Sequence, residues 1–474
     1  MKKLPILSKM SRKFNSALPN VIKAIALIFL ILPVNGMALA KRHVYNRPQT
    51  EVADLIKQAL TAPQNSCVSV KPVYSGKGQT VIDFGAKPND GNDDSQAFQA
   101  MLDANHDLVI PEGTYNINKS VIVKMKKNVQ IFGLGTVNLV SGDQKKTGIF
   151  SISASTGVLI SNITFIGTAA KPDCQNTGIF FGSKDNDYVG VFDCKFTDKD
   201  GAGLNIGINA QNGSSHFIAS GCTFNNLVGT TSGNGYGILV AYTTDSKICN
   251  NVFTGSSGNG RHAVYLSAGD ENILVIGNTM SGFNSASIMF NCYTYQPENK
   301  NNIIKNNTIT GGPDPSNRVG QITVFGKCWN NIIDSNKLNG SKQMGIFVSG
   351  NSGPKFDAAN VGRGAKIMNN TIENSGTYGI AISGANNVDL INNKIDNAGS
   401  NDDRGNGYTA IYISSNIYDK VLPPAHDIRL KNNVVTGKNT RSPLSMDKGS
   451  KNKPYNIDID KTNVLPKMRV SGVE

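Results

Sequence analysis

The sequence lacks any apolar run long enough to cross a membrane. Its stretch Ala24 to Val34 is eleven residues long, whereas a spanning helix needs about 20. Lys and Arg residues precede this run, and the small-x-small tripeptide Ala38 to Ala40 follows it. This order is typical of a secretory signal peptide over residues 1–40, cleaved before Lys41. We therefore expect a secreted or periplasmic protein without membrane contact after cleavage; an uncleaved N-terminal anchor is the alternative.

Acidic residues are absent before Lys41. Because six Lys and Arg residues lie there, cleavage lowers the formal net charge from +13 to +7. A basic chain favours polyanionic partners. For an exported protein these are acidic polysaccharides or lipid head groups rather than nucleic acid, so we expect an acidic polysaccharide partner and no nucleic acid. A charge that serves only solubility is the alternative, and the sequence does not indicate an oligomeric state.

The cysteines lack metal-site spacing. Seven cysteines form no Cys-x-x-Cys pair and have no zinc-like spacing with the five histidines. The sequence therefore predicts no structural metal site and no cofactor. An odd number of cysteines leaves at least one thiol unpaired in an exported chain.

A repeated motif, an Asn two residues before an aliphatic or aromatic residue, organises the rest of the chain. Successive copies are 27, 29, 29, 34, 23 and 40 residues apart, at Asn251, Asn278, Asn307, Asn336, Asn370, Asn393 and Asn433. Short period-two strands run in phase with it, such as "GILV" at Gly237 and "AVYL" at Ala263. A period in the high twenties without helices predicts an all-β fold, a right-handed parallel β-helix solenoid.

The repeated Asn has a structural explanation. Successive rungs of a β-helix stack at about 4.8 Å. At an inward turn position, each side-chain amide can donate to the next rung and accept from the last, which satisfies buried polar groups. Cys194 and Cys222 occupy the same phase in earlier rungs, and we expect them to be buried free thiols.

The ends of the solenoid must be covered, since an open end exposes unpaired strand edges. The segment from Asp93 to Ala104 has apolar residues at helical spacing, which predicts an amphipathic helix over the N-terminal end. We expect a second short helix at Thr50 to Ala62. We divide the chain into an N-terminal extension at 41–80, the β-helix at 81–440, and a tail or cap at 441–474.

Three segments resemble a known family. They are "VIDFGAKPNDGNDDSQAFQAML" (Val81 to Leu102), "LVIPEGTYNI" (Leu108 to Ile117) and "VQIFGLG" (Val129 to Gly135). Together they are similar to the entry signature of the pectate-lyase-like superfamily, which includes pectate lyases, polygalacturonases and phage tailspikes. The resemblance covers roughly Val81 to Val435 and implies the fold. It does not select a reaction, because the superfamily includes lyases, hydrolases, epimerases and glycan binders.

One sheet should present a wall of outward side chains, since residues between the inward aliphatics point out. We expect this wall to contain Phe180, Asn205, Leu239, Tyr265, Met289, Thr323, Phe347, Ala381 and Tyr412. None is a carboxylate, which argues against a calcium cage and against paired glycosidase acids on this face. Carboxylates such as Asp198 and Asp270 lie in turns, so a hydrolase that uses two of them stays open.

The stretch "SGNGRHAVYL" differs from the earlier "SGNGYGILV" by an Arg-His pair. Counted from Gly260, the first inward residue comes one position later than when counted from Gly235, which predicts an inserted residue that re-aims a side chain. A control frame, "GNGYTAIYIS" at Gly405, has Tyr408 and Thr409 in place of Arg261 and His262. The frame is thus structural, and the Arg-His pair distinguishes the earlier rung.

Arg261, His262 and Tyr265 suit β-elimination on a uronic-acid polymer. Arg261 would pair with the sugar carboxylate and stabilise the enolate-like intermediate. His262 or Tyr265 would remove the proton, and the other would protonate the departing oxygen. Asn205, Tyr236, Tyr242 and Asn291 are the predicted substrate-binding residues. An Arg-His pair that only bonds a local turn is the alternative.

Three classes of function therefore compete. A lyase on an acidic polysaccharide is favoured by the basic charge, the export signal and the Arg-His-Tyr group. A C5 epimerase shares the proton abstraction, and a glycoside hydrolase is disfavoured by the missing outward acids. A glycan-binding or surface-structural β-helix without turnover is the remaining class.

Overall fold

The computed structural model describes most of the chain after residue 50. The described residues are 51–63, 66–76, 78–104, 107–142, 148–168, 176–198, 203–230, 233–255, 260–293, 295–350, 361–399, 409–415, 423–437, 440, 442–447 and 453–466. The predicted signal peptide, residues 1–40, lies outside them.

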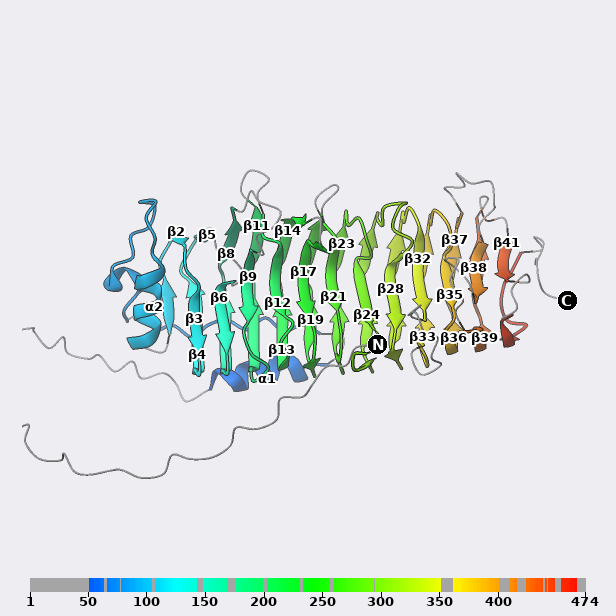
Figure 1. Cartoon of the computed structure of the whole chain (residues 1–474), viewed down its shortest axis with the longest axis horizontal. Coiled ribbons are helices and arrows are strands. Elements are labelled where there is room, and N and C mark those ends of the chain that lie inside the picture. The colour runs from blue at the N-terminus through cyan, green and yellow to red at the C-terminus, as the bar shows by residue number, and fades with distance from the viewer. Residues whose placement is uncertain are drawn as a thin grey trace, which may run out of the picture. The chain divides into compact units, whose positions relative to one another are not determined.

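Three long parallel sheets make up the fold, and the chain visits them in turn on each rung (Figure 1). Sheet B contains β1 (Leu108–Ile110), β4 (Lys127–Gly133), β7 (Thr156–Ser161), β10 (Asp187–Phe192), β13 (Ser214–Ser220), β19 (Lys247–Cys249), β22 (Leu274–Ile276), β26 (Ile303–Lys305), β30 (Ile332–Asp334), β33 (Lys366–Met368), β36 (Asn386–Ile391), β39 (His426–Lys431) and β42 (Tyr455–Ile459), with β18 (Thr243–Thr244) also paired to β13.

Sheet A follows sheet B on each rung. It contains β2 (Gly113–Ile117), β5 (Val137–Ser141), β8 (Thr164–Gly167), β11 (Lys195–Asp198), β14 (Thr223–Leu227), β20 (Val252–Gly255), β23 (Thr279–Ser281), β27 (Thr308–Thr310), β31 (Lys337–Asn339), β34 (Thr371–Glu373), β37 (Lys394–Asp396) and β40 (Val434–Thr436).

Sheet C completes each rung. It contains β3 (Val121–Lys124), β6 (Gly148–Ser153), β9 (Thr177–Phe181), β12 (Ile206–Ala210), β17 (Tyr236–Val240), β21 (His262–Leu266), β24 (Ile288–Cys292), β28 (Gly320–Gly326), β32 (Met344–Ser349), β35 (Ile380–Ser383), β38 (Thr409–Ser414) and β41 (Ser442–Met446). Two short ribbons join β15 (Gly229–Thr230) to β16 (Gly233–Asn234) and β25 (Asn299–Lys300) to β29 (Cys328–Trp329). The predicted all-β parallel solenoid is confirmed.

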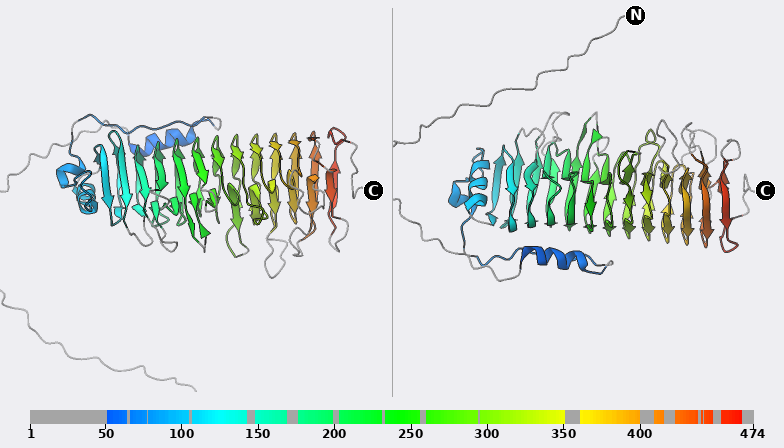
Figure 2. Two further views of the ribbon diagram at one scale, coloured as in Figure 1. Left: turned by 90° about the horizontal axis from the view of Figure 1, so that it is seen from above. Right: turned by 60° about the horizontal axis from the view of Figure 1, so that its bottom comes forward.

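Two α-helices and one 3₁₀ turn, η1 (Val81–Phe84), precede the strands among the described residues. Helix α2 (Ser95–Ala104) covers the N-terminal end of the coil (Figure 1), with the Phe98 ring 5.4 Å from the ring of Tyr115. The predicted capping helix is thus confirmed. Helix α1 (Val52–Thr61) lies alongside sheet B (Figure 2), and its Val52, Ile56 and Ala59 are buried there.

The coil continues past the predicted boundary at residue 440. In the tail, β41 pairs with β38 and β42 pairs with β39. These two strands were not predicted, because the segment is rich in Lys, Pro and Asn and its alternation of apolar residues is short. Their inward residues include Leu444 and Ile457.

The Asn ladder is confirmed at the corner between sheets B and A. Asn307 Nδ2 donates to Asn336 Oδ1 and to the carbonyl of Val275, both at 3.0 Å. Its Oδ1 accepts the backbone N–H and the Nδ2 of Asn278, both at 2.9 Å. Each buried amide therefore satisfies its own polar atoms and two backbone groups of neighbouring rungs. Cys194 and Cys222 continue this column as buried free thiols.

The residue before each ladder Asn explains why the motif is often Asn-Asn. Asn306 has a φ of 54° and Asn369 a φ of 57°, and Gly277 occupies the same place with a φ of 66°. Among residues with a side chain, Asn tolerates this left-handed conformation best. The first Asn of the pair thus adopts the left-handed backbone conformation of the corner, and the second places its side-chain amide in the buried ladder.

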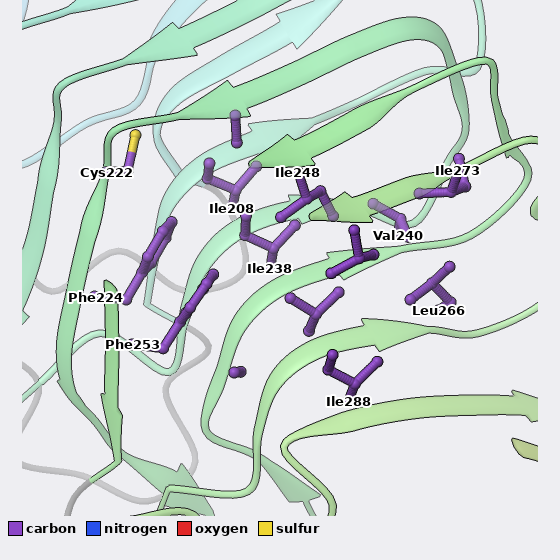
Figure 3. Close-up of a cluster of buried hydrophobic side chains, with 14 of the residues drawn as sticks. Ile208, Cys222, Phe224, Ile238, Val240, Ile248, Phe253, Leu266, Ile273 and Ile288 are labelled. Atoms are coloured by element: carbon purple, nitrogen blue, oxygen red, sulfur yellow. The ribbon is translucent and has the colours of Figure 1, made fainter. Parts of the chain in front are cut away.

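The interior beside this corner is aromatic. Phe165, Phe196, Phe224 and Phe253 stack with ring centroids 4.8, 4.7 and 4.6 Å apart. Figure 3 shows Phe224 and Phe253 lying parallel, with Ile208 and Ile238 of sheet C beside them. The distance between the rings therefore matches the distance between rungs. The stacked rings favour the register of sheet A in which these Phe residues are paired.

Asp270, a predicted turn residue, is fully buried in the coil. Its Oδ1 accepts the Thr243 N–H at 3.0 Å, but Oδ2 has no hydrogen-bond partner. Burial raises the pKa of this carboxyl well above its ordinary value. The folded state thus binds a proton that the unfolded chain releases above about pH 4, and folding stability falls as pH rises through the raised pKa.

The substitution Asp270→Asn is therefore expected to stabilise the fold. An amide needs no proton, and its Nδ2 can donate as Asn299 Nδ2 does to the Leu266 carbonyl at 3.2 Å. We expect a gain of about 1–3 kcal/mol in the free energy of unfolding at pH 8 and a smaller gain at pH 4. Denaturant melts at both pH values measure it, with the exposed Asp245→Asn as control. A gain that is the same at both pH values would contradict the assignment.

Candidate active site

The outward column of sheet C follows from its strand pairing. In register lie Phe180, Asn209, Leu239, Tyr265 and Met289. Asn209 is thus the outward residue of β12, and the placement of Asn205 on this wall is wrong. Two overlapping tetrads, "GLNI" at Gly203 and "GINA" at Gly207, fit the repeat equally, and the backbone pairing selects the second.

Asn205 is a structural residue of the preceding turn. Its side chain is buried, its Oδ1 accepts the N–H of Asn176 at 3.0 Å, and its Nδ2 donates to the carbonyl of Val228 at 2.7 Å. Both polar groups of the side chain are therefore engaged inside the protein.

The described residues show no inserted residue at the entrance of β21, so this prediction is wrong there. Strands β17 and β21 pair with Tyr236 opposite His262 and Leu239 opposite Tyr265, without a register shift. The N–H groups of Gly235 and Arg261 are equivalent, since each donates at 2.9 Å to a carbonyl one rung back. His262 thus replaces Tyr236 at the same strand position, and the count from Gly235 and Gly260 was one residue out of register.

His262 is enclosed by aromatic rings. It is 3% exposed, and its ring stacks on Tyr236 at 5.3 Å and meets Tyr265 at 5.1 Å. Its Nδ1 lies 2.6 Å from the carbonyl oxygen of Ala286. Because a carbonyl only accepts, Nδ1 bears the proton and Nε2 holds the lone pair. Burial lowers the pKa of His262 to about 3, with a smaller contribution from the charge of Arg261.

The pKa of Tyr265 is shifted in the direction opposite to that of His262. Burial raises the pKa of its phenol to about 12, although the hydrogen bond from Asn291 acts against the shift. Asn291 Nδ2 donates to Tyr265 Oη at 3.0 Å, and the buried Oδ1 of Asn291 has no partner. The phenol oxygen therefore accepts from Asn291 and retains its own proton to donate.

Arg261 lies on the solvent-exposed side of the group formed by His262, Tyr236 and Tyr265. Its Nη1 donates to Tyr236 Oη at 3.3 Å, and its side chain is exposed. Tyr236 and Tyr265 are 5.2 Å apart. The structure thus brings together Arg261, His262, Tyr265, Tyr236 and Asn291, five of the seven predicted site residues.

Tyr242 lies away from this group. It follows the far end of β17, six residues after Tyr236 and hence about 20 Å along the sheet. Its ring covers Gly269, where an added Cβ would lie 2.8 Å from Tyr242 Cδ1. Tyr242 therefore belongs to the corner between sheets C and B.

Two exposed tyrosines near that corner were not predicted. Tyr293 and Tyr295 stack with centroids 5.9 Å apart and are 42% and 82% exposed. Tyr293 is close enough to Tyr265 to raise its pKa. The sequence signal was "YTY" directly after Cys292, and such flat exposed rings suit stacking on sugar faces.

The control rung has the same geometry without the imidazole. Thr409 starts β38 at the position of His262, and Tyr412 takes the place of Tyr265 and stacks on Tyr378 at 4.6 Å. Tyr408 lies outside the described residues. The strand frame is therefore structural, as predicted, and the histidine is specific to β21 among the two rungs.

The described ranges contain neither a candidate metal site nor a candidate membrane span. No group of three or more His, Cys, Asp or Glu side chains in those ranges could hold a metal ion. No helix there has the length and apolar character of a membrane span.

Comparison with known proteins identifies the fold. No family model and no curated protein matches the sequence. The structure is similar to PfbA, a surface adhesin of Streptococcus pneumoniae, at 15% identity over 80% of this chain and 93% of that chain, with a TM-score of 0.58. It is also similar to the Dettilon tailspike protein, at 13% identity over 81% and 70% of the two chains, with a TM-score of 0.53.

A third solved structure is the A-module of the mannuronan C-5 epimerase AlgE6 of Azotobacter vinelandii. It is 15% identical over 82% of this chain and 99% of that chain, with a TM-score of 0.49. At these identities the comparisons report the fold alone. The right-handed parallel β-helix implied by the resemblance to the pectate-lyase-like superfamily is confirmed.

Proposed function

We propose that this right-handed parallel β-helix is an exported enzyme that abstracts the C5 proton of an acidic, uronic-acid polysaccharide at His262, as a lyase. The observation on which the proposal depends is a pair of titratable side chains, 5.1 Å apart, whose environments push their pKa values in opposite directions. Such a pair assigns an acid and a base.

The protonation states match the chemistry. With pKa values of about 3 and about 12, His262 is an unprotonated base and Tyr265 a protonated acid over the whole neutral range. His262 Nε2 takes the proton, the C–H electrons form the C4–C5 double bond, and the C4–O bond breaks. The Tyr265 phenol protonates the departing oxygen. A C5 epimerase uses the same abstraction and returns a proton to the opposite face.

The remaining residues bind the sugar. Arg261 provides an exposed guanidinium for the substrate carboxylate, which lowers the energy of the enolate-like intermediate. Asn291 holds the phenol of Tyr265 in place through the hydrogen bond from its Nδ2. Tyr293 and Tyr295 provide stacking surfaces for flanking sugars.

Glycan binding without turnover is the second candidate. It is favoured by the 3% exposure of His262, since an enclosed imidazole can serve as a rigid wall for the neighbouring tyrosines. The hydrolase receives no support from the outward column, because Phe180, Asn209, Leu239, Tyr265 and Met289 include no carboxylate.

The products distinguish these functions. The purified protein is incubated in D₂O with polygalacturonate, polymannuronate, hyaluronan and, as a neutral control, dextran. New ultraviolet absorbance from the C4–C5 double bond conjugated with the carboxylate indicates a lyase, and deuterium at C5 without this absorbance indicates an epimerase. New reducing ends without either would overturn the proposal in favour of a hydrolase, and retention on a substrate column without any product would favour the binder.

A further inference from the structure

A pair of cysteines lies where the N-terminal segment contacts the coil. Residues 51–63 and 66–76, which we call the N-terminal arm, include α1 and pack on the outer face of sheet B. Val52, Ile56 and Ala59 bury themselves against Leu159, Phe192 and Ile218. The arm then runs on to Cys67, which packs against the same cluster as Cys249 of β19. The two cysteines are far apart in sequence and meet in space.

A buried lysine fixes the approach of the arm at this point. Lys247 is 2% exposed, and its Nζ donates to the carbonyl of Ser66 at 2.8 Å and to that of Ala62 at 3.5 Å. Ser66 precedes Cys67 in the chain, and Lys247 lies two residues before Cys249 on the same side of the strand. The position of Cys67 over Cys249 is therefore set by a second, independent contact.

The two thiols form a hydrogen bond with each other, and Cys249 differs from the core thiols in the direction of its pKa shift. The hydrogen bond between Cys67 and Cys249 lowers the pKa of Cys249, helped by Lys247, and raises the pKa of Cys67. Burial raises the pKa of Cys194, Cys222 and Cys328. Because the thiolate is the reactive form of a cysteine, Cys249 is the favoured nucleophile. Cys67 is only half-buried, so a small oxidant reaches the pair from its side.

We infer that Cys67 and Cys249 form a disulfide in an oxidising environment and so fasten the N-terminal arm to sheet B. With glutathione disulfide as oxidant, one cysteine thiolate attacks a glutathione sulfur and expels the first glutathione thiolate. The second cysteine thiolate then displaces the other glutathione. The protein loses two protons and two electrons and gains one S–S bond, and glutathione disulfide becomes two thiols.

The bond would keep an apolar surface covered. Leu159, Phe192, Ile218 and Ile276 of sheet B lie under the arm, and they would be exposed if it lifted. In the chain-entropy account, a link between residues so distant in sequence constrains the unfolded chain strongly. The oxidised protein is therefore expected to melt at a higher temperature than the reduced protein, with the arm less open to protease.

The test is equilibration of the purified, reduced chain with a series of glutathione redox mixtures, followed by alkylation, intact mass measurement and peptide mapping. We expect a species lighter by two hydrogens in which a peptide with Cys67 is joined to one with Cys249. Cys67→Ser and Cys249→Ser should each abolish it and retain a glutathione adduct instead. Circular dichroism confirms that these variants fold.

Two results would overturn the inference. One is a wild-type protein that carries only glutathione adducts, or none, at every mixture in which glutathione itself is mostly oxidised. The other is a crosslink that maps to another pair, such as Cys194 with Cys222. Trypsin digestion of oxidised and reduced protein checks the consequence for the arm, and equal cleavage after the exposed Lys57 of α1 in both forms would refute the fastening.

Discussion

Alanine at position 262 is expected to lower kcat for elimination by about 10²- to 10⁴-fold, the usual contribution of a general base. The reason is that no other described side chain beside Tyr265 offers a neutral nitrogen lone pair. The measurement is the initial rate of unsaturated product on the polysaccharide that responds in the panel. Binding of that polysaccharide, followed by affinity electrophoresis, should change little, since Tyr293, Tyr295 and Arg261 remain.

The chain offers its own control for this substitution. Thr409 occupies the equivalent position of β38, so Thr409→Ala tests the loss of a side chain at the same place on the strand and should leave the rate unchanged. Arg261→Ala should weaken both binding and rate, by about 10- to 100-fold in kcat/KM for one lost charge-assisted bond. Full activity of both His262→Ala and Arg261→Ala would remove the site assignment while leaving the fold intact.

Alanine at position 307 is expected to cost about 3–5 kcal/mol in the free energy of unfolding. The substitution deletes an amide that makes four buried hydrogen bonds, to Asn278, Asn336 and Val275. Each buried group left without a partner costs about 1–3 kcal/mol, and part of this is recovered by relaxation of the column.

Denaturant unfolding, monitored by circular dichroism, measures this loss. Asn339→Ala is the matched control, because Asn339 is exposed on the next rung and its side chain bonds only to exposed Asn374. We expect a change below about 0.5 kcal/mol for the control. Equal effects of the two substitutions would mean that the ladder contributes nothing beyond an ordinary surface amide.

The fold could be predicted because each repeat contains a residue type that favours the left-handed backbone conformation its corner requires. The left-handed Asn306 and the inward Asn307 recur together, so the pair "NN" marks one corner of each rung. Helix α2 could also be predicted, from the helical spacing of its apolar residues. The strands of the tail were not, since β41 and β42 show only brief alternation among Lys and Asn.

That Arg261, His262 and Tyr265 lie together could be predicted from the sequence, but the register of every strand could not. Whether Gly203 or Gly207 begins the strand depends on which carbonyls face which N–H groups one rung away, and periodicity alone does not contain that choice. The burial of His262 likewise depends on Tyr236 of the rung before and Ala286 of the rung after. Asp270 looked like a turn residue because its neighbours do, and its burial follows from the stacking of Asn299.

The corner between sheets B and A has a consequence for how such a chain can diversify. From β13–β14 to β39–β40, two residues always separate the strand of sheet B from that of sheet A. Over the same rungs, the connection from sheet A to sheet C varies, from four residues between β31 and β32 to twelve between β37 and β38. Insertions are thus absorbed beside the face that holds His262. The length of these loops can therefore vary, while the constant two-residue connection at the opposite corner keeps the scaffold unchanged.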